Sequence, residues 1–189
     1  MGLSTPGPGG STRLVRVFVL GIDPGLSRCG YAVISPGRHG RGAAKALGVI
    51  RTSPEQQTPH RLAELKYELT ALIDEFRPVV IAVERIFFQN NVRTAVSVAQ
   101  ASGMALVLGA ERGLVVAQYS PSEVKSVVAG DGRADKKQVQ TMVQTLLGLE
   151  RPPRPADAAD AAALALCHLA HDPHLKQATT QTLGSIGAR

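Results

Sequence analysis

Two apolar segments of this chain each stop at a carboxylate. Residues 15–23 read VRVFVLGID and are followed by Pro24-Gly25, a strong turn signal, and residues 79–84 read VVIAVE. Short continuous apolar runs of this kind are typical of strands that are covered on both faces. Functional sites of open α/β sheets lie at the carboxyl ends of the strands. If the two strands are parallel neighbours, Asp23 and Glu84 lie close together at one edge of the sheet.

The order of the segments predicts an α/β fold with a mixed five-stranded sheet flanked by helices. Residues 15–23, 29–35 and 46–52 read as an antiparallel meander. Leucines at helical spacing from residue 62 predict a helix before the strand at 79–84, and a second helix over roughly 92–112 precedes a strand at 114–119. Capping-box sequences at Ser120 and Asp135 begin two further helices. We expect the first strand at the centre, between the second and the fourth.

The last predicted helix begins with two aspartates. Residues 155–168 read PADAADAAALALCH, an alanine-rich pattern that indicates a buried helix. Asp157 and Asp160 are three positions apart and therefore share a helix face. Acidic residues in a first turn stabilise the free N–H groups and the helix dipole, so capping is one interpretation. A cation that both carboxylates bind is the other, and this segment alone favours neither.

The four carboxylates together favour the cation. Asp23 could form an Asx turn and Glu84 could pair with Arg85, but four converging anions without a counter-charge would repel one another strongly. Carboxylate oxygens are ligands that Mg²⁺ and Mn²⁺ prefer, and no Cys/His cluster suggests zinc. Two cations roughly 4 Å apart suit in-line attack of water on a phosphodiester.

Composition limits the class of protein. The 189 residues are 44% apolar and fit one domain, for which we expect a flexible tail at 1–14, a folded domain at 15–171 and a second tail at 172–189. No apolar run approaches the roughly 18 residues of a membrane span, so no membrane partner is expected. Two cysteines in apolar settings, Cys29 and Cys167, suggest a reducing cytoplasm. The formal charge of +6 and a pI near 9.7 are compatible with a polyanionic partner.

Basic and aromatic residues provide a candidate nucleic-acid surface. Four basic residues flank a Gly-Asp-Gly turn between helices, where they either face phosphates or form a solvated helix face. Two aromatic rings follow the strand at 79–84 and either stack on an unpaired base or close the edge of the core. These residues are Lys125, Arg133, Lys136, Lys137, Phe87 and Phe88, and Arg85 and Arg93 could extend the surface. His168 is expected to be a core or helix-end histidine.

Four blocks of sequence, in this order and spacing, resemble the RuvC-type Holliday junction resolvases of bacteria. The blocks are LGIDPGLSRCGYAVI, VERIFFQNNVRTA, YSPSEVKSVVAGDGRADKKQVQTMV and ADAADAAALALCH, and the resemblance covers about residues 15–169. It implies an RNase H-like fold, a homodimer, and Mg²⁺-dependent paired nicking of four-way DNA junctions in recombination and repair. It also implies cooperation with the RuvA–RuvB branch-migration complex.

The resemblance also implies roles for individual residues. The acidic tetrad of the family matches Asp23, Glu84, Asp157 and Asp160. Its junction-contacting aromatic matches Phe87, with Phe88 as an adjacent alternative. Its functional lysines match Lys125 and Lys136, with Lys137 next to the second.

Three other functions remain as alternatives. An RNA-processing nuclease of the YqgF type shares the GxDxG opening, but its pattern is not expected to include the block from residue 125 to 137. An actin-like phosphotransferase would use Asp23-Pro24-Gly25 to hold ATP phosphates and would need a second glycine-rich loop. A junction-binding module without catalysis would not need four carboxylates. For a homodimer, small residues at Ala95, Ala99 and Gly103 provide a candidate interface.

Overall fold

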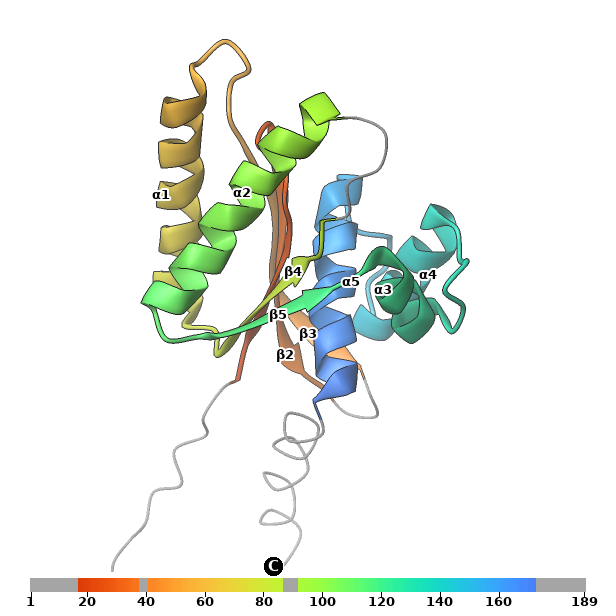
Figure 1. Ribbon diagram of the computed structural model, residues 1–189. Helices are drawn as coiled ribbons and strands as arrows, with labels where there is room; N and C mark the ends of the chain where they lie inside the picture. The colour runs from red at the N-terminus through yellow and green to blue at the C-terminus, as the bar shows by residue number, and fades with distance from the viewer. Residues whose placement is uncertain (1–16, 38–40, 87–91, 173–189) are drawn as a thin grey trace, which may run out of the picture.

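The computed structural model describes residues 17–37, 41–86 and 92–172 (Figure 1). These residues form five strands and five helices. In chain order the elements are β1 (Val19–Asp23), β2 (Arg28–Pro36), β3 (Gly42–Arg51), α1 (Thr58–Phe76), β4 (Val80–Glu84), α2 (Val92–Glu111), β5 (Val115–Tyr119), α3 (Pro121–Ala129), α4 (Lys136–Leu147) and α5 (Ala156–His171).

The strands form one mixed sheet in the order β3-β2-β1-β4-β5. Strand β2 pairs antiparallel with both β1 and β3, whereas β4 pairs parallel with β1 and β5 pairs parallel with β4. The expected central place of β1, between β2 and β4, is therefore confirmed. Strand β3 begins at Gly42, earlier than the predicted residue 46, because it follows β2 along its whole length with an irregularity at Val33/Ile34.

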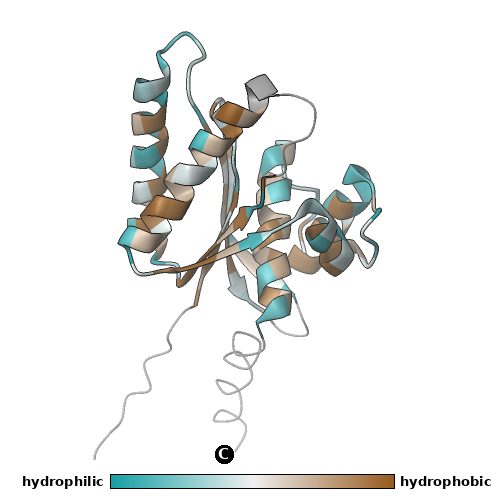
Figure 2. Cartoon of the chain, viewed as in Figure 1, coloured by the Kyte–Doolittle hydropathy of each residue, from teal (hydrophilic) through white to brown (hydrophobic). Residues whose placement is uncertain are grey.

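Helices cover both faces of the sheet. Helices α1 and α2 lie on one face, and α5 lies on the other with α3 and α4 outside it (Figure 1). Each layer has its own apolar core, and hydrophobic residues, brown in Figure 2, occur on the strands and on helices of both layers. Strand β1 contributes to both cores, with Val19 toward α5 and Leu20 toward α1 and α2, which explains its continuous apolar sequence.

Helix α5 is the buried helix that the sequence predicts. Every residue from Ala158 to Leu169 is buried except Asp160. Its backbone lies directly against β1 and β2, because both strands carry a glycine at the contact. A Cβ atom on Gly21 would lie 2.0 Å from the carbonyl oxygen of Ala161, and one on Gly30 would lie 2.1 Å from that of Asp157. The close approach fixes the first turn of α5 over the start of β2.

Helices α3 and α4 begin where the sequence predicts. The Ser120 hydroxyl accepts a hydrogen bond from the backbone N–H of Glu123, and the Glu123 carboxylate accepts one from the N–H of Ser120. Asp135 and Gln138 form the same reciprocal pair at the start of α4. These capping boxes fix the two helices that carry Lys125 and Lys136.

Other expectations concern the ends and the cysteines. The predicted tails lie outside the described residues, apart from Asp172. Within the described part of the chain, none of the helices has the length and apolar character needed to cross a membrane. Cys29 and Cys167 are both buried and form no disulfide.

Candidate active site

Asp23 and Glu84 meet at one edge of the sheet, as expected. Strands β1 and β4 are parallel neighbours with Ile22 opposite Val83, so the next residue of each strand is a carboxylate at the same level. Besides burial, the charge of the neighbouring Glu84 raises the pKa of Asp23, so the protonated form of Asp23 is favoured here.

Asp157 and Asp160 come to the same edge from the first turns of α5. Each carboxylate is paired with a basic side chain: Asp157 accepts hydrogen bonds from Arg28, and Asp160 accepts one from Lys136 at 2.7 Å. The N-cap of α5 is Pro155, which provides no side-chain cap. Both aspartates therefore bond to side chains outside α5, and neither serves only to cap the helix.

The four carboxylates influence one another electrically without converging on one point. Burial, together with the smaller effect of the negative charges of Glu84, Asp160 and Asp157, raises the pKa of Asp23 to about 8. Burial also raises the pKa of Glu84. Burial alone would raise the pKa of Asp157 as well, but the hydrogen bond and charge of Arg28 lower it overall. Among the described residues, no three His, Cys, Asp or Glu side chains lie together as a preformed metal site.

These residues fit a divalent cation. All four donors are hard carboxylate oxygens, which suit Mg²⁺ or Mn²⁺. Burial and neighbouring negative charges both disfavour the anionic form of Asp23 and raise its pKa. A cation at this edge would supply a positive partner, and the side chains of Asp157 and Asp160 could reach it by leaving Arg28 and Lys136.

The elevated pKa of Asp23 predicts a pH-dependent stability. The folded protein holds this proton more tightly than the unfolded chain, so the free energy of unfolding falls as pH rises from about 4 to about 8. The difference from the ordinary value corresponds to at most about 6 kcal/mol. Because the site is open to water, we expect Asp23→Asn to stabilise the metal-free protein by about 2 kcal/mol at pH 8 and by almost nothing at pH 4.

Urea denaturation in the presence of a chelator, from pH 4 to pH 9, measures this difference. The control is Asp131→Asn, because Asp131 is exposed and its Oδ1 accepts a local hydrogen bond from the N–H of Arg133, which asparagine can also provide. A gain from Asp23→Asn that did not vary with pH would contradict the assignment of an elevated pKa to Asp23.

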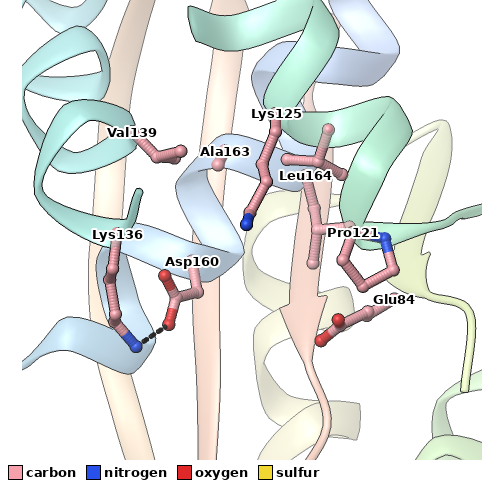
Figure 3. A pocket seen from close by; sticks show the side chains of 9 residues that line it. Glu84, Pro121, Lys125, Lys136, Val139, Asp160, Ala163 and Leu164 are labelled. Atoms are coloured by element: carbon pink, nitrogen blue, oxygen red, sulfur yellow. Dashed lines mark hydrogen bonds and ion pairs between the residues drawn. The ribbon is translucent and has the colours of Figure 1, made fainter. Parts of the chain in front are cut away.

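Two lysines and two of the carboxylates surround a cavity of about 290 Å³ (Figure 3). Lys125 points into it from α3, and Lys136 reaches across its edge to Asp160. The rest of the wall is mostly apolar. The lining residues are Glu84, Pro121, Val124, Lys125, Lys136, Val139, Asp160, Ala163 and Leu164. Lys125 and Lys136 therefore lie beside the carboxylates of Glu84 and Asp160.

A second hollow, of about 590 Å³, also has Glu84 in its wall. It lies between the turn after β1, the segment after β4 and the capping box of α3. Its lining residues include Pro24, Arg85 and Ser120. Arg85 donates a hydrogen bond to the backbone carbonyl of Gln118 at 3.1 Å, so the sequence alternative in which this guanidinium pairs with Glu84 is not what the structure shows.

Lys137 and Arg133 do not line either hollow. Phe87 and Phe88, and the side chain of Arg93, lie outside the described residues. His168 is buried, and its Nδ1 lies 2.7 Å from the hydroxyl oxygen of Tyr119, so the expectation of a core histidine is confirmed.

Sequence reasoning missed Arg28. It is the first residue of β2, directly before the buried run that begins at Cys29, and its partner Asp157 lies 129 positions away. A charged residue at the start of an otherwise apolar strand was the available signal, but it did not identify the partner.

The chain is similar to one family over most of its length. The family model described as crossover junction endodeoxyribonuclease RuvC matches residues 19–168. A protein of that name from Salinispora arenicola is 55% identical over 139 residues, which cover 73% of this chain and 79% of the relative. One from Leifsonia xyli is 48% identical over 142 residues, 75% of this chain and 68% of the relative.

Solved structures of RuvC proteins are also similar to this chain over most of its length. The Thermus thermophilus RuvC structure has a TM-score of 0.76 at 36% identity and covers 82% of this chain and 95% of its own. T. thermophilus RuvC in complex with Holliday junction substrate has a TM-score of 0.78 at 34% identity, with coverages of 86% and 97%. These structures have the RNase H-like fold, so the expected fold class is confirmed.

Proposed function

Because the chain belongs to the RuvC family of crossover junction endodeoxyribonucleases, we propose that it resolves Holliday junctions by nicking two strands symmetrically at the four-carboxylate edge of its sheet. The observation that supports this site is the meeting of Asp23 and Glu84 at the ends of parallel strands, with Asp157 and Asp160 delivered by α5 to the same edge. The lysine-lined cavity beside it provides positive charge for a DNA strand.

The carboxylates and the lysines of the site would have separate roles. Asp23, Glu84, Asp157 and Asp160 would hold divalent cations, with Mg²⁺ as the expected metal, Mn²⁺ as a substitute, and two ions per site. When bound, such cations neutralise charge on the attacked phosphate and favour in-line attack by water. Lys125 and Lys136 would hold the neighbouring phosphates, and Lys136 would leave Asp160 to do so.

The test is a cleavage assay with Mg²⁺ and four substrates: a labelled four-way junction, a duplex of the same sequence, an RNA–DNA hybrid and ATP. We expect paired symmetric nicks in the junction alone. Cutting of the hybrid would favour an RNA-processing nuclease, and hydrolysis of ATP would favour a phosphotransferase. Binding to the junction without cutting, with either Mg²⁺ or Mn²⁺, would favour a module without catalysis.

Lys125 provides a prediction about affinity. Since Lys125 points into the cavity beside Asp160 and Glu84, Lys125→Ala should remove one phosphate contact. The slope of log affinity against log salt for junction binding should then become shallower by roughly 0.9. Lys66→Ala is the control, because Lys66 is exposed on α1, across the sheet from the cavity. Equal slopes for Lys125→Ala and the unmodified protein would remove Lys125 from the DNA-binding surface.

A homodimer would place two active sites on one junction, and we propose α2 as its interface. Gly103 has open space where a Cβ would lie, and Val96 and Val107 are 52% and 48% exposed on the same helix. Burial of exposed valines stabilises an association, whereas a buried unpaired carboxylate opposes it. Val107→Glu should therefore give a monomer at micromolar concentration by light scattering.

The control for the dimer is Val115→Glu, since Val115 is 59% exposed on β5 rather than on α2. That variant should remain a dimer. If Val107→Glu also remains a dimer, the interface lies elsewhere. From family membership we further propose that the dimer cooperates with a RuvA–RuvB branch-migration complex.

A further inference from the structure

Arg28 joins the start of β2 to the first turn of α5. Its Nε donates a hydrogen bond to Oδ2 of Asp157 at 3.0 Å, and its Nη2 donates a second to the same oxygen. The two side chains are 43% and 26% exposed, so the pair lies at the surface of the site. Asp157, which we propose as a metal ligand, is therefore already paired with the cationic side chain of Arg28.

A divalent cation and a guanidinium compete for such a carboxylate. Both bind its oxygen atoms directly, and two cations at contact distance repel each other. The pair is partly exposed, and exposed ion pairs contribute little to stability, which makes the exchange feasible. Lys136 is paired with Asp160 in the same way. Lys136 also lines the cavity, however, and the proposed function already assigns it a phosphate contact there.

Arg51 is the neighbour with which a displaced Arg28 side chain could bind a phosphate. It is the last residue of β3 and is directly opposite Arg28 in the register of β2 and β3. Residues directly opposite in an antiparallel pair point to the same face, and like charges there destabilise the sheet. The bond to Asp157 offsets that repulsion. Once Arg28 leaves Asp157, two guanidinium groups stand side by side, an arrangement that a phosphate stabilises.

We propose that Arg28 is a positioning residue that holds Asp157 in the metal-free protein, is displaced when a divalent cation binds, and then joins Arg51 on a phosphate of the bound DNA. This inference rests on the proposed function, because it takes Asp157 as a metal ligand and DNA as the substrate. It adds a phosphate-binding site at Arg28 of β2 and Arg51 of β3, outside the lysine-lined cavity.

The first test is Mn²⁺ binding to the DNA-free protein, followed by calorimetry or by the spin-resonance signal of the free ion. Arg28→Gln should bind Mn²⁺ roughly two- to fivefold more tightly, because the competing cation is gone. Arg28→Lys, which keeps the charge but not the forked geometry, should lie between this variant and the unmodified protein. Arg51→Gln is the matched control: it removes a neighbouring exposed arginine that does not bond to Asp157, and it should change the affinity less than twofold.

The second test is the salt dependence of junction binding, with Ca²⁺ at a concentration where the DNA stays uncut. Arg28→Gln and Arg51→Gln should each make the slope shallower by roughly 0.9, and Lys66→Ala should not. Thermal melts establish that each variant is folded.

The outcomes separate this inference from the proposed function. If the unmodified protein binds no Mn²⁺, the metal site itself is wrong and both fall. If it binds Mn²⁺ and cuts junctions but Arg28→Gln binds the ion equally or more weakly, Arg28 orients Asp157 for the metal and the displacement is wrong. If the slopes of the two arginine variants are unchanged, the phosphate site is wrong.

Discussion

Asp157→Asn and Asp160→Asn are each expected to reduce the rate of junction cleavage by about a thousandfold or more while junction binding is kept. Each substitution removes one anionic oxygen from the proposed metal site, and charge stabilisation there contributes several kcal/mol to the transition state. Asp23→Asn and Glu84→Gln should have the same effect. Single-turnover cleavage with Mg²⁺, and binding measured without metal, check both halves of the prediction.

Asparagine distinguishes the two interpretations of the α5 aspartates. It stabilises a helix start about as well as aspartate does, so a role limited to capping would survive the substitution. Asp135→Asn is the matched control, since Asp135 is the N-cap of α4 and bonds to the backbone N–H of Gln138. We expect that variant to cut at the unmodified rate. A folded Asp157→Asn protein that also cut at that rate would restrict Asp157 to the helix start.

Local patterns and strand order account for what was predictable from the sequence. The apolar runs that end at Asp23 and Glu84 indicated two buried strands, and the order of the segments placed the first strand between the second and the fourth. If those neighbours were parallel, the two carboxylates had to lie close together at the sheet edge. The capping boxes at Ser120 and Asp135 are also local, because each is formed by a residue and its third neighbour.

The partners of the carboxylates were not predictable in the same way. Arg28 and Asp157 are 129 positions apart, and Lys136 and Asp160 are 24 apart on different helices. Their meeting depends on how closely α5 lies on the sheet, which no periodicity encodes. The sequence therefore predicted a convergence of bare carboxylates, whereas the structure pairs two of them with basic side chains.

That close approach is the basis of the second prediction with a large effect, which concerns Gly30. A Cβ on this residue would lie 2.1 Å from the carbonyl oxygen of Asp157 and 2.6 Å from its carbonyl carbon. Both atoms belong to backbone, so no side-chain rotation relieves the overlap, and α5 must move away from β2. Forced overpacking usually costs 1–3 kcal/mol, and a clash with a buried helix backbone exceeds that range. We expect Gly30→Ala to destabilise the protein by about 4 kcal/mol and to lower its melting temperature by roughly 10 °C.

Gly21→Ala separates loss of stability from loss of the site. Its Cβ would lie 2.0 Å from the carbonyl oxygen of Ala161, which is one helical turn after Asp157, so its effect on stability should be similar. At a temperature where both variants are folded, Gly30→Ala should cut junctions at least tenfold more slowly than Gly21→Ala, because only Gly30 faces the backbone of Asp157. Gly132→Ala is the control for the substitution itself, since its nearest contact would be an ordinary 3.4 Å. Equal cleavage rates in folded Gly30→Ala and Gly21→Ala would show that the position of Asp157 does not depend on the contact between β2 and α5.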